Sequence, residues 1–144
     1  MLDVQRNRGA IHQREVIFTR KIMWSHMIAG AALIAMLLLH ELFWWFGGAV
    51  IWYSVSLYSM LGLMNEQRWC QWALAALFIL ITASGLYFTT YIFPTLVPIK
   101  APLLPHSLIP IWVGLVNLLY AIGATIMLFS GKVRKASMVG FTLW

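Results

Sequence analysis

The stretch SHMIAGAALIAMLLLHE, residues 25–41, decides the fold class, because it is a long apolar run with a histidine near each end. Hydrophobic residues make up 62% of the 144-residue chain and charged residues 10%, whereas soluble domains carry about 25% charged residues. Apolar runs of this kind, close to the roughly 20 residues that a helix needs to cross a bilayer, occur four times. The predicted membrane spans are residues 24–46, 46–64, 69–93 and 108–130.

The backbone of each span must satisfy its own hydrogen bonds in lipid, which only helices and closed barrels achieve. The runs lack the alternation of apolar and polar residues that is typical of barrel strands. The sequence therefore predicts an all-α integral membrane protein, a four-transmembrane-helix bundle that forms a single membrane domain over residues 1–144. Residues 1–23 are polar and basic, without a short apolar core or a small-residue cleavage site, so we expect no removable signal peptide. Residues 131–144 form the predicted cytoplasmic tail.

The basic residues are distributed very unevenly along the chain. With four spans, nine of the 10 Lys and Arg residues fall on one side of the membrane, and Lys100 lies alone on the other. The nine are Arg6, Arg8, Arg14, Arg20, Lys21, Arg68, Lys132, Arg134 and Lys135. By the positive-inside rule both termini are cytoplasmic, and the net charge of +6 reflects topology and anionic lipid rather than nucleic acid. We predict an integral protein of a bacterial cytoplasmic (inner) membrane.

The connections between the spans follow from the local sequence. The aromatic run FWWF, residues 43–46, and the pair Gly47 and Gly48 predict a tight outer turn between the first two spans. The four residues NEQR, 65–68, predict a short cytoplasmic turn. The outer segment PTLVPIKAPLLPH, residues 94–106, has four prolines yet stays mostly apolar. This composition predicts a loop that lies in the outer interface and can act as a lid.

His26 and His40 stand fourteen residues apart, near the two ends of the first span. At about 100° per residue they lie within about 40° of the same face of a helix, and about 21 Å apart along its axis. Ionisable residues inside spans are uncommon and usually face a bundle interior or a watery cavity. Imidazole is a favoured axial ligand of heme, and this separation suits one heme in each leaflet.

The candidate cofactor-binding residues are His26, His40, Glu41 and His106, and the candidate metal ligands are His40 and His106. These two lie on the predicted outer side and could together hold one heme b, whereas His26 has no matching histidine inside. A quinone head group is the alternative, because His40 and Glu41 can bind its carbonyls and exchange protons. Structural roles stay open: His26 reaching headgroups or water, His40 bonded to a hydroxyl of a neighbouring helix, and His106 lying in the interface.

Two segments resemble a known family. RKIMWSHMIAGAALIAMLL, residues 20–38, and QRWCQWALAALFILITASGLYF, residues 67–88, are similar to the opening spans of diheme cytochrome b membrane anchors, as found with formate dehydrogenases and hydrogenases. Gln71 and Trp72 stand where that family has histidine and tryptophan, and residues 84–86 where it often has threonine, glycine and leucine. The resemblance implies electron transfer between a partner subunit and quinone. It also implies a scaffold that lacks one heme ligand, because glutamine is a poor ligand.

The expected function is that of a small membrane subunit of a respiratory or other energy-converting complex, which transfers electrons through a b-type heme or a quinone site near the outer leaflet. The alternative is a cofactor-free accessory subunit that stabilises a larger complex through contacts with lipids and other membrane subunits. No nucleotide-binding fingerprint is present, and the 4 acidic residues assemble no nucleophile, base and orienting acid. We therefore expect a non-catalytic subunit of an oxidoreductase complex rather than an enzyme by itself. The single cysteine, Cys70, is expected to be a packing residue.

Overall fold

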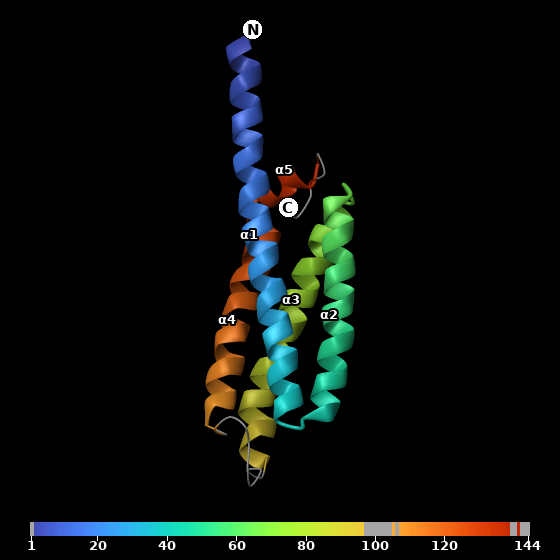
Figure 1. Ribbon diagram of the computed structural model, residues 1–144, viewed down its shortest axis with the longest axis vertical. Helices are drawn as coiled ribbons and strands as arrows, with labels where there is room; N and C mark the ends of the chain where they lie inside the picture. The colour runs from blue at the N-terminus through green and yellow to red at the C-terminus, as the bar shows by residue number, and fades with distance from the viewer. Residues whose placement is uncertain (1, 97–104, 106, 139–140, 142–144) are drawn as a thin grey trace.

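Four long helices run side by side in the computed structural model, which describes residues 2–96, 105, 107–138 and 141, with side chains from residue 13 onward (Figure 1). They are α1 (Leu2–Leu39), α2 (Phe43–Met64), α3 (Trp69–Tyr87) and α4 (Leu108–Phe129). A π-helix, η1 (Phe88–Ile92), and a 3-10 turn, η2 (Phe93–Thr95), prolong α3, and a short helix, α5 (Gly131–Ala136), follows α4. The described residues contain no strand, so the all-α prediction is confirmed.

Four helical segments, the third of which runs through α3, η1 and η2, are apolar and long enough to cross a membrane. These segments are Gln13–Leu39, Phe43–Met64, Trp69–Thr95 and Leu108–Phe129. In lipid, helices of this length satisfy their backbone hydrogen bonds internally, as a spanning segment must. The chain is therefore an integral membrane protein with four spans, as the hydropathy pattern predicted.

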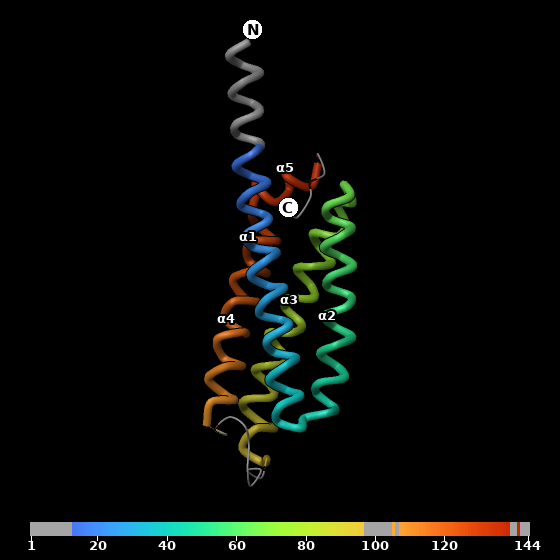
Figure 2. The backbone as a smooth tube through the Cα atoms, viewed as in Figure 1, coloured from blue at the N-terminus to red at the C-terminus, as the bar shows by residue number. Residues whose placement is uncertain are grey.

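The four spans close into a bundle. Each long helix packs against its neighbours in the sequence, α4 packs back against α1, and the most extensive contact joins α3 to α4 (Figure 2). Methionine, leucine and phenylalanine side chains fill the core; Met23, Leu63, Leu74, Phe78 and Met127 are fully buried. The start of α1 and the helix α5 lie at the same end of the bundle (Figure 1). This end is named the inner end and the opposite end the outer end.

The turn between α1 and α2 differs from the predicted one. The first span was expected to continue to Phe46 and to turn at Gly47 and Gly48, but the chain reverses at residues 40–42, where Glu41 adopts a left-handed φ of 57°. The Leu42 N–H donates to the Leu37 carbonyl at 3.0 Å, and α2 then begins at once. The aromatic run and both glycines are helical because helix formation satisfies their backbone groups at membrane depth, where an open turn would leave them unpaired.

The inner turn lies where it was predicted. Residues 65–68 form the short turn between α2 and α3, with the Asn65 N–H donating to the Gly62 carbonyl at 3.1 Å. The predicted outer loop, residues 94–106, contains η2 at its start and lies otherwise mostly outside the described residues. The proposed lid, Lys100 and His106 therefore fall outside what the structure describes.

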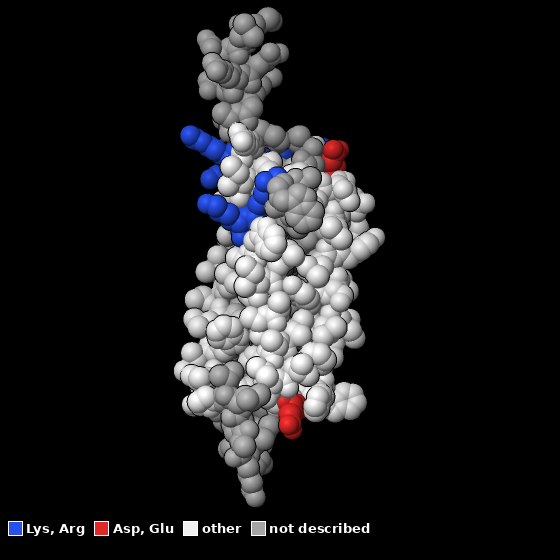
Figure 3. Space-filling model, in the orientation of Figure 1, with Lys and Arg blue, Asp and Glu red and all other residues white. Residues whose placement is uncertain are grey.

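Basic side chains surround the inner end. Figure 3 shows them gathered beside α5, with none on the visible flank between the two ends. The exposed ones are Arg14, Lys21, Arg68, Lys132, Arg134 and Lys135. The described cations therefore lie at one end, as the positive-inside reading requires, and this end is the cytoplasmic one by that rule.

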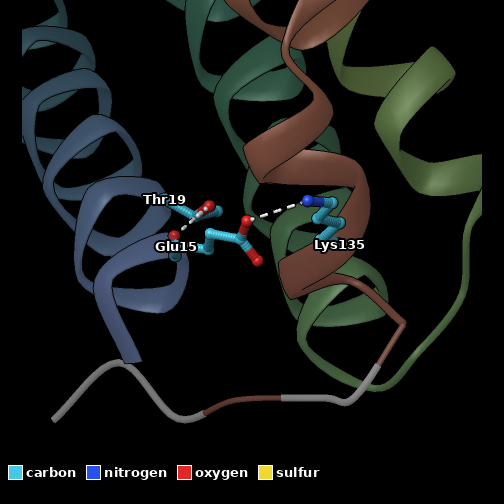
Figure 4. A network of polar contacts seen from close by, with 3 residues as sticks. All are labelled: Glu15, Thr19 and Lys135. Carbon is cyan, nitrogen blue, oxygen red and sulfur yellow. Dashed lines mark hydrogen bonds and ion pairs between the residues drawn. The ribbon is translucent and has the colours of Figure 1, made fainter. Parts of the chain in front are cut away.

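Helix α5 folds back onto α1 at the inner end. Lys135 Nζ lies 3.4 Å from Glu15 Oε1, and the Thr19 hydroxyl donates to the Glu15 carbonyl at 2.9 Å (Figure 4). Lys132 Nζ lies 5.0 Å from the centre of the Phe18 ring, within the range of a cation–π contact. These contacts attach the tail helix to the first span.

The tail also reaches the second span. Val133 and Ala136 of α5 are buried, and beyond the helix the Phe141 N–H donates to the Met64 carbonyl at 3.2 Å. That carbonyl belongs to the last turn of α2, where main-chain acceptors lack helical partners. The tail therefore links α1 to α2 across the inner end of the bundle.

Candidate functional site

A cavity of about 430 Å³ opens in the outer half of the bundle and is lined by residues from all four spans. We name it the outer cavity. Its walls are mainly apolar, with Leu33 and Leu37 of α1 on one side. The aromatic lining residues are Trp44, Trp45, Trp52 and Phe88, and the polar ones are Ser84 and Asn117. A mainly apolar pocket with few polar groups is the usual form of a small-molecule site.

Asn117 is the polar feature that sets this cavity apart. The residue is 6% exposed, and its Nδ2 is buried without a hydrogen-bond partner among the described residues. An unsatisfied buried amide costs about 1–3 kcal/mol in a protein interior. The terminal torsion of asparagine is broad and roughly two-fold, so rotation can present the N–H group to the cavity. The site therefore offers a donor to a ligand with an acceptor atom.

Gly85 makes room for this amide. A Cβ atom placed at Gly85 would lie 2.1 Å from Asn117 Oδ1 and 2.5 Å from Nδ2, so the amide would have to shift. Because glycine stands here, the Asn117 side chain lies directly against the backbone of α3. Ser84, the preceding residue, also lines the cavity and adds a hydroxyl near the same helix.

The aromatic walls are fixed by contacts of their own. Trp45 packs edge to face on Phe88, with ring centres 5.0 Å apart, and Trp52 packs in the same way on Tyr120 at 5.0 Å. The Trp52 indole N–H donates to the Leu77 carbonyl at 3.0 Å. Both aromatic pairs use the edge-to-face geometry that aromatic rings favour. The walls are thus flat surfaces held in defined orientations.

Phe88 is also the first residue of the π-helix η1. A π-helical turn is rare, and here it stands at the end of α3, directly before the 3-10 turn η2. Here it changes the winding of the third span where that span meets the cavity. The irregularity lies next to the outer cavity, because Phe88 is one of the residues that line it.

His26 lies in the bundle core on the inner side of the cavity. The residue is 2% exposed, and its ring stacks on Phe78 with ring centres 4.5 Å apart and an interplanar angle of 3°. Its Nδ1 lies 2.7 Å from the Ile22 carbonyl oxygen, and its Nε2 lies 3.1 Å from the Leu119 carbonyl oxygen. A Cβ on Gly123 would come within 2.0 Å of Nε2. The imidazole thus joins α1, α3 and α4 and does not reach out of the bundle, contrary to the reading of His26 as a headgroup or water contact.

His40 and Glu41 form the turn at the outer end of α1. His40 is 3% exposed, whereas Glu41 is exposed, and neither lines the outer cavity. The turn nevertheless lies between two lining residues, Leu37 and Trp44. His106 lies outside the described residues, so a heme b between His40 and His106 stays a prediction. In the part of the chain that the structure describes, no group of three or more His, Cys, Asp and Glu side chains is placed to hold a metal ion.

Gln71, which stands where the cytochrome b resemblance has a histidine, is buried and donates its Nε2 to the Met127 carbonyl of α4. It therefore ties α3 to α4. Cys70, beside it, is buried with a free thiol. Both residues have a packing role in this arrangement.

Asn117 was not among the residues singled out from the sequence. The signal was present, because Asn117 is the sole Asn or Gln in the span 108–129, and polar residues inside spans usually face the bundle interior. Ser84 and Gly85 were noted through the family resemblance, but not as neighbours of Asn117. No protein-family model, curated protein or solved structure matches the chain.

Proposed function

We propose that the protein is a small membrane subunit of an energy-converting complex and that its outer cavity binds the head group of a quinone. The observation that carries the proposal is the buried Asn117 amide, whose Nδ2 lacks a hydrogen-bond partner among the described residues and which lines a mainly apolar, aromatic cavity. A ligand with a flat ring and a carbonyl acceptor matches that combination of walls and donor.

The complementarity extends to the other lining residues. Trp52 and Phe88, which both line the cavity, offer aromatic surfaces on which a quinone ring can stack, and one carbonyl oxygen accepts a hydrogen bond from Asn117. The Ser84 hydroxyl supplies a second donor from the neighbouring helix. The volume of about 430 Å³ lies within the roughly 300–1,000 Å³ typical of small-molecule pockets. Leu33, with the other aliphatic lining residues, offers an apolar path for the start of the isoprenoid tail.

His40 and Glu41 have a different place in this proposal from the one the sequence suggested. Oxidation of a quinol to a quinone releases two electrons and two protons. The electrons pass to a redox group of a partner subunit, and the protons leave toward the outer side, where the Glu41 carboxylate is exposed. A carboxylate at that depth can accept and release a proton. Glu41 and His40 act as proton-exit groups rather than as cofactor ligands.

A heme b held by His40 and His106 is the other form of the redox proposal, with the bacterial inner membrane as the proposed location. We favour the quinone because the residues proposed to contact it are all described and line the cavity, whereas His40 does not line it.

The alternative from another class is an accessory subunit without a cofactor, in which the cavity holds a lipid chain or a side chain of a partner subunit. An apolar occupant would leave the Asn117 amide without an acceptor, which is why the quinone is preferred.

Tryptophan fluorescence tests the proposal, because three tryptophans line the cavity. A benzoquinone with a decyl chain is titrated into the purified protein in detergent, and quenching is followed. We expect Asn117→Leu, which keeps the size but removes the amide, to weaken binding about 10-fold, the value of one lost hydrogen bond. The matched control is Asn65→Leu at the exposed inner turn, which should bind as the wild type does. Equal affinity in both variants would favour the accessory subunit instead.

A further inference from the structure

A second cavity lies at the inner end of the bundle, on the opposite side of the membrane from the outer cavity. It is about 470 Å³ in volume, and we name it the inner cavity. It lies where α3 begins and where α4 gives way to α5. The polar lining residues are Arg68, Gln71, Ser130 and Arg134, and the apolar ones include Trp72 and Phe129. Polar and apolar lining thus meet in one concave site.

We propose that the inner cavity binds the phosphate of one anionic phospholipid of the inner leaflet, such as phosphatidylglycerol. Arg68 and Arg134 come from segments far apart in the sequence, one just before α3 and the other within α5, yet both line this cavity. Guanidinium groups bind phosphate oxygens with paired hydrogen bonds, which gives them both affinity and geometric selectivity for phosphate.

The two arginines are not neutralised by the acidic side chains that the structure describes. Neither forms an ion pair within residues 13–96 and 107–138, although Glu66 stands two positions from Arg68 in the sequence. Glu15, by contrast, pairs with Lys135 on the α1 side of α5. The positive charge of the inner cavity is therefore available to an anionic ligand.

The apolar lining fits the rest of a phospholipid. Trp72 is 62% exposed and Phe129 82% exposed, and both lie within the spans, next to the arginines. A lipid with its phosphate between Arg68 and Arg134 would lay its acyl chains along these two rings and down the outside of α3 and α4. Aromatic residues are typical of this depth, at the boundary between headgroups and hydrocarbon. A free phosphate ion would use the arginines but not the rings.

Native mass spectrometry tests this proposal. The full chain is purified in detergent, mixed with a known concentration of one lipid, and released from the detergent in the spectrometer. We expect the wild type to retain one phosphatidylglycerol, several-fold more tightly than phosphatidylcholine, whose choline group cancels the phosphate charge. Arg68→Gln combined with Arg134→Gln should weaken phosphatidylglycerol binding about 10-fold or more. The matched control is Arg14→Gln combined with Lys21→Gln, which removes the same charge from exposed positions at the same end and should leave that lipid bound.

Three results would overturn the proposal. Equal loss in both double variants would indicate diffuse attraction to the basic surface, and equal retention of phosphatidylcholine would remove the charge selectivity. Displacement of the lipid by inorganic phosphate at equal concentration would identify a site for free phosphate.

If the double glutamine variant does not fold, Arg134→Lys serves in its place. It keeps the charge but loses the paired hydrogen bonds, so phosphatidylglycerol binding should weaken by an intermediate amount. Wild-type affinity in a folded Arg134→Lys protein would then count against the site.

Discussion

Asn117 of α4 lies directly against Gly85 of α3, so closely that a Cβ on Gly85 would be 2.1 Å from Asn117 Oδ1. The contact places a polar amide at the most extensive helix–helix interface of the bundle and at the wall of the outer cavity. Close approach through a small residue is how helices pack in lipid, where no hydrophobic driving force brings them together. One contact thus serves both the packing of α3 on α4 and the proposed ligand site.

Gly85→Ala should disturb both the packing of α3 on α4 and the proposed ligand site. The added methyl group must push Asn117 away, and overpacking of this kind costs about 1–3 kcal/mol. We expect a lower unfolding midpoint in detergent and weaker binding of the decyl benzoquinone. Gly114→Ala is the matched control, because a Cβ there meets nothing within 4 Å and alanine favours the helix. A Gly85→Ala protein as stable as the control would show that the two helices are not packed as described.

Tyr120→Phe should lower stability modestly. The Tyr120 hydroxyl donates to the His26 carbonyl at 2.7 Å and so links α4 to α1. Hydrogen bonds between membrane helices contribute about 0.5–1.5 kcal/mol, which sets the expected loss in the free energy of unfolding. Tyr58 is 68% exposed, and Tyr58→Phe removes a hydroxyl that does not make this bond. This substitution should leave the free energy of unfolding unchanged. Equal effects of the two substitutions would contradict the link.

Glu15→Gln should loosen α5 while leaving the bundle intact. The substitution weakens the contact with Lys135, whose side chain is 64% exposed, so the global stability should fall by less than about 1 kcal/mol. Backbone amides of α5 should nevertheless exchange with deuterium faster, because the helix is only six residues long and depends on docking. Glu66→Gln, at the exposed inner turn, is the control and should not change exchange in α5. Unchanged exchange in Glu15→Gln would mean that the buried Val133 and Ala136 hold the helix alone.

An optical spectrum separates the two redox proposals. If the cavity binds quinone and no heme is present, the reduced protein shows no heme b band, and quinone extracted from the purified protein decreases in Asn117→Leu. A heme b band that disappears in His40→Ala, and that survives Asn117→Leu, would instead support axial ligation by His40. His12→Ala, outside the predicted spans, is the control for nonspecific loss of pigment.

Hydropathy and charge were sufficient to predict the main features of the fold. The four spans, the inner turn at residues 65–68 and the gathering of described cations at one end all agree with the sequence reading. Each depends on a local property: an apolar run long enough to cross lipid, a short polar break, or the position of a lysine or arginine. The outer turn was misplaced because Gly47 and Gly48 permit a turn without requiring one. The actual reversal depends on the conformation of Glu41, which the residue type does not specify.

The sequence by itself determined that this chain spans a membrane four times and which residues lie at each end, because transfer into lipid depends on composition summed along a segment. The tertiary structure decided which side chains meet. Asn117, Ser84 and Trp52 line one cavity, and Arg68 and Arg134 another, although they are far apart in the chain. Which side chains line the same cavity depends on how each helix is rotated about its axis and on how closely neighbouring helices approach. That rotation is set by small residues such as Gly85 and Gly123 facing larger partners, a relation between helices that hydropathy along one helix does not contain.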